Sequence, residues 1–319
     1  MLLALFAVLA LLPVFVGDNR VIMHLLVLAL IWAMVVAAWD LMMGFAGIFT
    51  FGQVAFLVVG AYSSAILSMH HGLSPWLSMP IAAGITALVG VLIALPCLRL
   101  KGAYVALATF ALHMILDPLI KSDIGRALGT GGSQGLIGIP PLSIGDYSFT
   151  TIDRVPWFYV ALVLAFCALL AIYRVIHSRW GLAFMAVRDS TPFARALGVD
   201  DFRYRILVFA ISAFITGFAG AFYAHYVGVL STRILGLELF LMLMVMLVIG
   251  GLGRFPGAVF GAFITIFLNY WLQPMEIWRP VVFGAIVVIM VIYMPRGIVG
   301  LLMPAGGFPW SKRRSGGNT

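Results

Sequence analysis

The sequence predicts an all-α, polytopic membrane protein, and two features of its composition lead to this fold class. Of the 319 residues, 63% are hydrophobic and only 9% are charged, whereas soluble domains carry about 25% charged residues. The hydrophobic residues form long runs that are interrupted by short polar segments. A soluble fold could not hide this much apolar surface, and helices satisfy their own backbone hydrogen bonds within lipid.

The apolar runs predict the individual membrane spans, since crossing the hydrocarbon core takes about 20 helical residues. The first run lacks the basic start and the small-residue cleavage site of a secretory signal, so we expect a helix there. Several runs are short, which favours broken or re-entrant helices. We expect about ten transmembrane helices, in the order Leu2–Val16, Val21–Trp39, Gln53–Met69, Pro75–Leu95, Ala103–Leu119, Trp157–Ile176, Ile206–Leu230, Leu237–Gly251, Pro256–Leu272 and Trp278–Met294.

The distribution of basic residues predicts the orientation in the membrane. The polar stretch 174–205, here the arginine segment, holds six arginines and three aspartates. Placing it in the cytoplasm puts 13 of the 19 Lys and Arg residues on that side, as the positive-inside rule requires. We therefore expect one transmembrane domain over 1–319, with both termini in the cytoplasm, an external loop 120–156, and a cytoplasmic tail 304–319. The net charge of +8 then reflects basic loops facing membrane lipid rather than a nucleic-acid partner.

A repeated tetrapeptide suggests an internal repeat. The sequence G-F-A-G occurs at Gly44–Gly47 and at Gly217–Gly220, near the second and seventh spans. Each copy precedes a span that opens on glycine. An offset of five spans reverses direction, so the pattern predicts an inverted repeat in which interrupted helices line a substrate path. The candidate path residues are Gly44, Gly47, Gly52, Gln53, Gly217, Gly220 and Glu238. Glu238 also has a structural explanation, because a carboxylate is favoured at the start of a helix. Gly253, Gly257 and Gly261, spaced four apart, predict a helix-packing face.

Several kinds of chemistry are not supported by the sequence. No lysine follows a glycine, as a P-loop would require, so any ATP must be bound by another chain. The run Gly131–Gly135 matches the G-x-S-x-G pattern of serine hydrolases, but it lies in a glycine-rich loop, where we expect a flexible turn. Cys97 and Cys167 lack metal-ligand spacing, and no chain of intramembrane polar groups suggests a proton relay. We therefore expect neither enzymatic activity nor a bound cofactor.

Local signals within the arginine segment predict two short helices. Gly181–Val187 fits an interfacial helix, and the residues from Asp189 to Pro192 give the start of a second one. Phe193 and Leu197 then fall on one face, and Gly198 ends the helix. The physical pattern leaves two interpretations open, an interfacial helix with snorkelling arginines or a docking helix for a cytoplasmic partner.

The segment W-G-L-A-F-M-A-V-R-D-S-T-P-F-A-R-A-L-G-V, residues Trp180–Val199, resembles the cytoplasmic coupling loop of permeases in ATP-binding-cassette (ABC) importers. It is most similar to the LivM-like permeases for branched-chain amino acids. Three further stretches share this resemblance, namely Gly44–Tyr62, Thr130–Leu136 and Gly250–Ala262. Arg254 departs from the family pattern, which more often has a small polar residue there.

The resemblance implies a non-catalytic subunit of the bacterial inner membrane. Its expected partners are a LivH-like second permease, two cytoplasmic ATPase subunits that bind the ATP, and an external solute-binding protein that docks near 120–156. The residues implied in ATPase coupling are Gly181, Arg188, Asp189, Pro192, Phe193, Arg195, Leu197 and Gly198. Leucine, isoleucine and valine are the default substrates, and urea, amides or aromatic acids are the alternatives. A secondary carrier and an intramembrane hydrolase that uses Ser133 are alternatives of another class.

Overall fold

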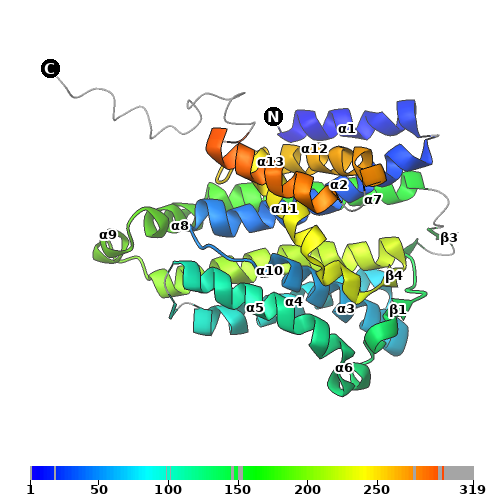
Figure 1. Cartoon of the computed structure of the whole chain (residues 1–319), viewed down its shortest axis with the longest axis horizontal. Helices are drawn as coiled ribbons and strands as arrows, with labels where there is room; N and C mark the ends of the chain where they lie inside the picture. The colour runs from blue at the N-terminus through cyan, green and yellow to red at the C-terminus, as the bar shows by residue number, and fades with distance from the viewer. Residues whose placement is uncertain are drawn as a thin grey trace.

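The protein is described by a computed structural model that covers residues 2–17, 19–97, 99–100, 102–144, 147–149, 154–275, 278–293 and 297. Nearly all of this chain is helical, as expected (Figure 1). The α-helices are α1 (Leu2–Val16), α2 (Arg20–Asp40), α3 (Gln53–His71), α4 (Pro75–Cys97), α5 (Ala103–Lys121), α6 (Asp123–Ala127), α7 (Arg154–Ile176), α8 (Arg179–Asp189), α9 (Thr191–Ala196), α10 (Asp201–Val227), α11 (Leu237–Gly250), α12 (Gly257–Trp271) and α13 (Arg279–Tyr293). The expected tail 304–319 lies outside the described residues.

Short elements complete the chain. A π-helix η1 (Leu41–Phe45) continues α2, and three 3₁₀ helices are η2 (Gly132–Gln134), η3 (Thr232–Leu235) and η4 (Gln273–Met275). Two antiparallel strand pairs join β1 (Leu136–Ile137) to β4 (Val229–Leu230), and β2 (Ser143–Ile144) to β3 (Tyr147–Ser148).

Six helices in the described part of the chain are long and apolar enough to cross a membrane. They are α2 with η1, α3, α4, α5, α7 and α10. The shorter apolar helices are α11, α12 and the part Arg279–Met290 of α13. The protein is therefore polytopic, and each of the ten expected spans contains a helix. The expected span Ile206–Leu230 is displaced, because its helix begins at Asp201 and ends at Val227. Gly228 adopts a left-handed conformation (φ 74°) there, and Leu230 pairs with strand β1.

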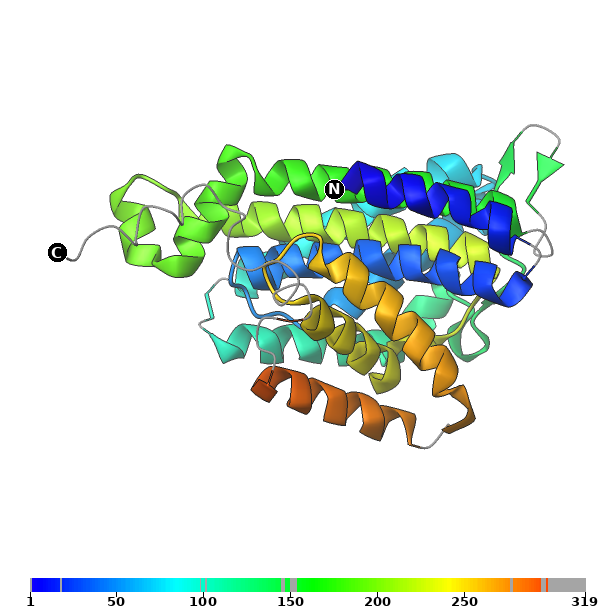
Figure 2. The same ribbon diagram turned by 90° about the horizontal axis from the view of Figure 1, so that it is seen from above.

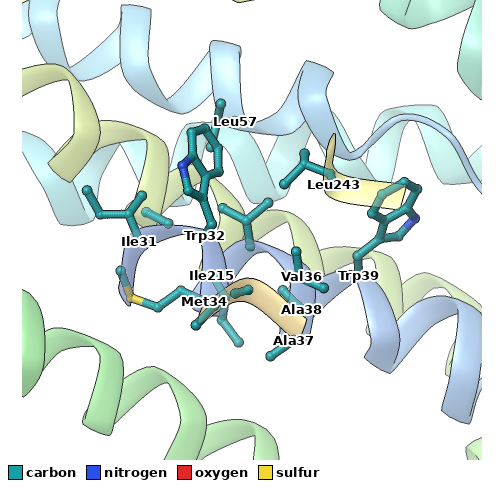
Figure 3. Close-up of a cluster of buried hydrophobic side chains, with 14 of the residues drawn as sticks. Ile31, Trp32, Met34, Val36, Ala37, Ala38, Trp39, Leu57, Ile215 and Leu243 are labelled. Atoms are coloured by element: carbon teal, nitrogen blue, oxygen red, sulfur yellow. The ribbon is translucent and has the colours of Figure 1, made fainter. Parts of the chain in front are cut away.

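The long helices lie side by side and define two ends of the molecule (Figure 1). Helix α9 marks one end, here the α9 end, and strands β1, β3 and β4 mark the other, here the strand end. Helix α2 lies in the centre, because every residue from Ala29 to Asp40 is buried. A helix that is apolar on all sides must be covered on all sides. Figure 3 shows α2 side chains such as Trp32 and Met34 beside Leu57 of α3, Ile215 of α10 and Leu243 of α11.

Glycines allow the central helices to approach closely. A side chain at Gly60 of α3 would collide with the backbone of Gly217 in α10, and one at Gly220 would collide with the backbone of Leu57. Small residues favour such contacts in membranes, because they bring two backbones together. Helix α12 packs on α11 in the same way through Gly257 and Gly261. The third glycine of the expected packing face, Gly253, lies in the turn before α12 rather than on the helix.

We expect Gly60→Ala to destabilise the protein by about 1–3 kcal/mol, because the new methyl group meets a backbone that cannot move aside. The matched control is Gly84→Ala on α4, where nothing lies within 4 Å of the added carbon. That substitution should be neutral or slightly stabilising, since alanine is the better helix former. Thermal unfolding of both variants in detergent measures the difference, and equal midpoints would contradict the proposed close contact.

Candidate functional site

Helices α8 and α9 form the segment that the sequence predicts as a cytoplasmic loop, and local caps set their limits. Ser178 accepts a hydrogen bond from the Trp180 amide at 3.1 Å and begins α8. Ser190 accepts one from the Phe193 amide at 3.4 Å and begins α9, with Pro192 in the first turn. Gly198 follows with a φ of 82°, so the helix ends where a left-handed residue is required. Helix α8 extends beyond the expected Gly181–Val187 by two residues at each end, whereas α9 ends at Ala196, one residue before the expected Leu197.

Helix α9 presents two apolar side chains to the outside. Phe193 is 64% exposed and Leu197 is 66% exposed, and residues four apart lie on one helix face. Arg195 donates to both carboxylate oxygens of Asp201 at 2.7 and 3.0 Å. This pairing fixes α9 against the start of α10 and raises the pKa of Arg195. Figures 1 and 2 show α9 projecting beyond the long helices, where a partner could reach it.

Arg188, near the end of α8, contacts the helix break that follows α2. Its Nη1 donates to the carbonyl oxygen of Gly44 at 2.7 Å, while its Nε donates to Asp189 at 3.0 Å. The aliphatic part of the same side chain occupies the space next to Gly47, whose φ is +68°. Any side chain at Gly47 would both strain the backbone and displace Arg188. Helix α8 is thus fixed to the region where α2 is interrupted.

A second contact connects this break to the turn before α12. The Asp40 carboxylate, which is buried, accepts a hydrogen bond from the Gly253 amide at 2.7 Å. A side chain at Gly44 would collide with both Asp40 and Gly253. We call the set Asp40, Gly44, Gly47, Arg188 and Gly253 the Arg188 junction. It joins three segments far apart in the sequence, and Arg188 supplies a positive charge that acts on the buried Asp40.

Two segments that are not α-helical each precede an apolar helix, and the end of the first segment lies beside the first turn of α11. Residues 46–52 separate η1 from α3, and residues 228–236 separate α10 from α11. Glycine precedes each helix, as Gly52 and Gly236, and neither N-terminus has a side-chain cap. The rings of Phe51 and Phe240 lie 5.3 Å apart, and we call the place where they pack together the meeting point. The uncapped first turns leave backbone N–H groups free near this contact.

Aromatic side chains and a histidine surround the meeting point. The Phe110 ring of α5 lies 6.4 Å from Phe51 and 5.6 Å from Phe240, and His113 lies 6.3 Å from Phe240. His113 is fully buried, and neither ring nitrogen forms a hydrogen bond of normal geometry, although the backbone of Leu235 lies nearby. We call Phe51, Phe110, His113 and Phe240 the aromatic cluster. A buried imidazole without good partners is energetically costly, which marks this position as a functional candidate.

The other expected path residues lie at different places. The Gln53 amide donates to Ser212 at 3.3 Å and to Thr216, so it ties α3 to α10. Glu238 pairs with Arg279 of α13 at 2.7 Å. Of the remaining five, Gly52 immediately precedes α3, Gly44 and Gly47 belong to the Arg188 junction, and Gly217 and Gly220 lie in helix contacts. Sequence reasoning assigned no site role to Asp40 or His113, and it assigned Gly253 only to a helix-packing face. The acidic residue at the end of an apolar run was the one available signal for Asp40.

Two side-chain contacts hold Pro140 and Ser143 of the expected external loop at the strand end. His225 Nε2 lies 2.9 Å from Ser64 Oγ, while Nδ1–H donates to the Pro140 carbonyl oxygen at 2.7 Å. Trp76 donates to the Ser143 carbonyl oxygen at 2.8 Å. Ser133 of the G-x-S-x-G match lies in the 3₁₀ helix η2. This is not the strand–turn–helix that places a hydrolase nucleophile.

Comparison with known proteins identifies the family. Residues 21–294 match the family described as "Branched-chain amino acid transport system / permease component". The permease LivM of Escherichia coli K12 is 26% identical over 298 residues, which cover 87% of this chain and 69% of LivM. The probable permease LivH of Methanocaldococcus jannaschii is 26% identical over 67% of this chain and 68% of its own length. The nucleoside permease NupC of Lactococcus lactis is 28% identical over 56% of this chain and 59% of its own length.

The comparison with solved structures finds no significant match. The family match nevertheless covers nearly the whole helical part of the chain, including both helix breaks and helices α8 and α9. The chain therefore belongs to the family of branched-chain amino acid transport permeases, which are multi-pass, non-catalytic membrane subunits of bacterial ABC transporters.

Proposed function

We propose that the chain is a permease subunit of a bacterial inner-membrane ABC importer for branched-chain amino acids. In this proposal, separate ATPase subunits bind α8 and α9, and their movement is transmitted to the membrane helices. The observation that carries the proposal is the 2.7 Å hydrogen bond from Arg188 to Gly44. It connects α8, which lies next to the projecting helix α9, to η1, the π-helix that continues the central helix α2.

The α9 end faces the cytoplasm in this proposal, which agrees with the positive-inside rule. Contacts give the direction of the helices. Helix α2 runs toward the α9 end, where Asp40 lies, and α10 runs away from it, from Asp201 beside Arg195 to His225 beside Pro140. Helix α11 ends just before Gly253, which contacts Asp40. Matching breaks after two helices of opposite direction support an inverted repeat in which α2 and α3 correspond to α10 and α11.

We place the translocation path at the aromatic cluster, where the end of the segment before α3 lies beside the first turn of α11. Free N–H groups at the starts of α3 and α11 suit a substrate carboxylate. The rings of Phe51, Phe110 and Phe240 suit an apolar side chain. Gly52 lets the backbone turn into α3 beside this path, while Gln53 and Glu238 position the helices that border it.

A substitution of His113 tests this placement. His113→Leu should raise thermal stability, because it removes a buried polar group without good partners, and it should lower uptake at least about tenfold if the imidazole contacts the substrate. Met114→Leu, on the outward face of the same helix α5, is the matched control and should leave both quantities unchanged. Normal uptake by His113→Leu would exclude His113 from the path.

The expected partners follow from the same proposal. A LivH-like second permease would complete the path, two ATPase subunits would bind α9, and a solute-binding protein would dock at the strand end near 120–156. The bonds from His225 to Pro140 and from Trp76 to Ser143 support this docking surface, because they hold these two loop residues against α10 and α4.

Competition for uptake tests the substrate assignment. The complete transporter, purified through a tag on this chain, is placed in proteoliposomes with ATP inside and binding protein outside. Labelled leucine should accumulate, and unlabelled isoleucine and valine should compete with it. Unlabelled urea, amides, aromatic acids and nucleosides should not compete with labelled leucine. Accumulation of one of these other solutes without leucine transport would assign the chain to another substrate class of the same family.

A further inference from the structure

An apolar groove opens on the membrane-facing side of the bundle, away from the aromatic cluster. It has a volume of about 520 Å³ and lies between α4, α7 and α10. Both α7 (green) and α10 (yellow-green) run along the bundle in Figure 2, and Figure 1 draws them at different heights, so the groove separates the two helices. All the lining side chains are apolar, among them Ala87 of α4, Cys167, Ala168 and Ala171 of α7, and Ala210 and Phe214 of α10.

The small side chains explain why the groove exists. Alanine at four of the lining positions leaves space that leucine or phenylalanine would fill. Protein interiors are otherwise densely packed, and an unfilled apolar space forfeits dispersion contacts along its walls. Cys167 and Phe214 are exposed at its rim, so the groove is open to the surrounding hydrocarbon rather than sealed inside the protein.

Two arginines extend the groove toward the α9 end. On α7 the lining residues 164, 167, 168 and 171 form one helical stripe, which Arg174 continues one turn further. On α10 the stripe runs back from Ala210 through Leu207 to Arg203 in the first turn. Arg203 is paired with the partly exposed Asp200 at 2.9 Å. Arg174 is exposed and forms no ion pair within the described residues.

We propose that the groove between α7 and α10 binds one anionic phospholipid, with an acyl chain against the alanines and the phosphate at Arg174 and Arg203. The acyl chain supplies the missing packing, and the headgroup supplies the negative charge that two arginines at a membrane surface attract. Small-molecule and cofactor pockets have volumes of roughly 300–1,000 Å³, and the volume of the groove lies within this range. This inference uses the proposed cytoplasmic position of the α9 end, but it does not depend on which solute is transported.

Native mass spectrometry of the purified full chain provides the test, with phosphatidylglycerol and phosphatidylcholine of identical acyl chains as probes. Each basic residue near an anionic headgroup contributes roughly fivefold to affinity. We therefore expect one phosphatidylglycerol to bind at least about tenfold more tightly than phosphatidylcholine. Arg174→Gln combined with Arg203→Gln should abolish this preference. Ala171→Trp should abolish binding of both lipids, because the indole fills the groove. The control Leu88→Trp, on an exposed surface of α4, should bind as the unmodified chain does.

A photoreactive group in the acyl chain gives a second readout that does not rely on the variants folding. Cross-links should concentrate on the α7 peptide that holds Cys167 and on the α10 peptide that holds Ala210. Equal affinity for the two lipids, or cross-links spread over all outward helix faces, would overturn the proposal. A change in oligomeric mass in Ala171→Trp with lipid binding intact would also overturn it, and would assign the groove to a protein contact instead.

Discussion

Replacing Phe193 and Leu197 together with aspartate should abolish stable binding of the ATPase subunits. Both side chains are about two-thirds exposed on one face of α9, which the structure presents at the end of the bundle. An apolar side chain buried at the centre of an interface often contributes at least 2 kcal/mol, or about 30-fold in affinity. Two buried carboxylates would add a desolvation cost. We therefore expect affinity, measured by titration of the purified ATPase, to fall at least about 30-fold.

The matched control for this experiment is Leu128→Asp. Leu128 is 65% exposed, as Phe193 and Leu197 are, but it follows α6 near the strand end. The Leu128→Asp variant should leave ATPase binding unchanged, because the proposed ATPase-binding surface on α9 lies at the opposite end of the bundle. Unchanged binding by the Phe193 and Leu197 variant would leave α9 as an interfacial helix against lipid, which is the other interpretation of its sequence.

Arg188→Gln should separate transport from ATPase binding. The partly exposed Arg188 side chain belongs to α8 and donates to Gly44, so it is not part of the apolar face of α9 formed by Phe193 and Leu197. Glutamine removes a charge-assisted hydrogen bond, a kind of interaction that contributes about 1.5–3 kcal/mol. If this contact transmits movement from α8 to the break after α2, ATP-driven uptake should fall roughly 10- to 100-fold. Binding of the ATPase subunits should remain normal.

The control for Arg188→Gln is Arg179→Gln at the other end of α8. Arg179 is exposed and forms no ion pair in the part of the chain that the structure describes. It should therefore retain both binding and uptake. Equal losses in the two variants would mean that total charge on α8 matters rather than the Arg188 junction. Normal uptake by Arg188→Gln would mean that movement reaches the membrane helices by another route.

The elements that the sequence predicts well are those with local physical signals. Ser190, Pro192 and Gly198 determine the limits of α9 through caps and backbone preferences, and these act within a few residues. The ten apolar runs predicted helices because length and hydrophobicity are properties of each run alone. The glycines before Gln53 and before Leu237 likewise mark where α3 and α11 begin.

The contacts that give these elements a function depend on residues far apart in the sequence. Asp40, Arg188 and Gly253 meet only because α2, α8 and the turn before α12 are packed together. Gln53 forms its hydrogen bonds across 159 and 163 residues of chain. His113 and the groove alanines carry no distinguishing pattern along the chain, since an isolated histidine or alanine is ordinary in a membrane helix. The structure draws attention to His113 because its ring nitrogens lack hydrogen-bond partners of normal geometry, and to the alanines because they line an unfilled groove.

Uptake of labelled leucine into proteoliposomes tests most directly the central claim that the chain is powered in trans through α8 and α9. One set of vesicles holds the complete transporter with ATP inside, and another holds the purified chain alone under an imposed proton or sodium gradient. We predict accumulation only in the first set, and its loss when Phe193 and Leu197 are replaced with aspartate. Gradient-driven accumulation by the chain alone would contradict the claim and identify a secondary carrier.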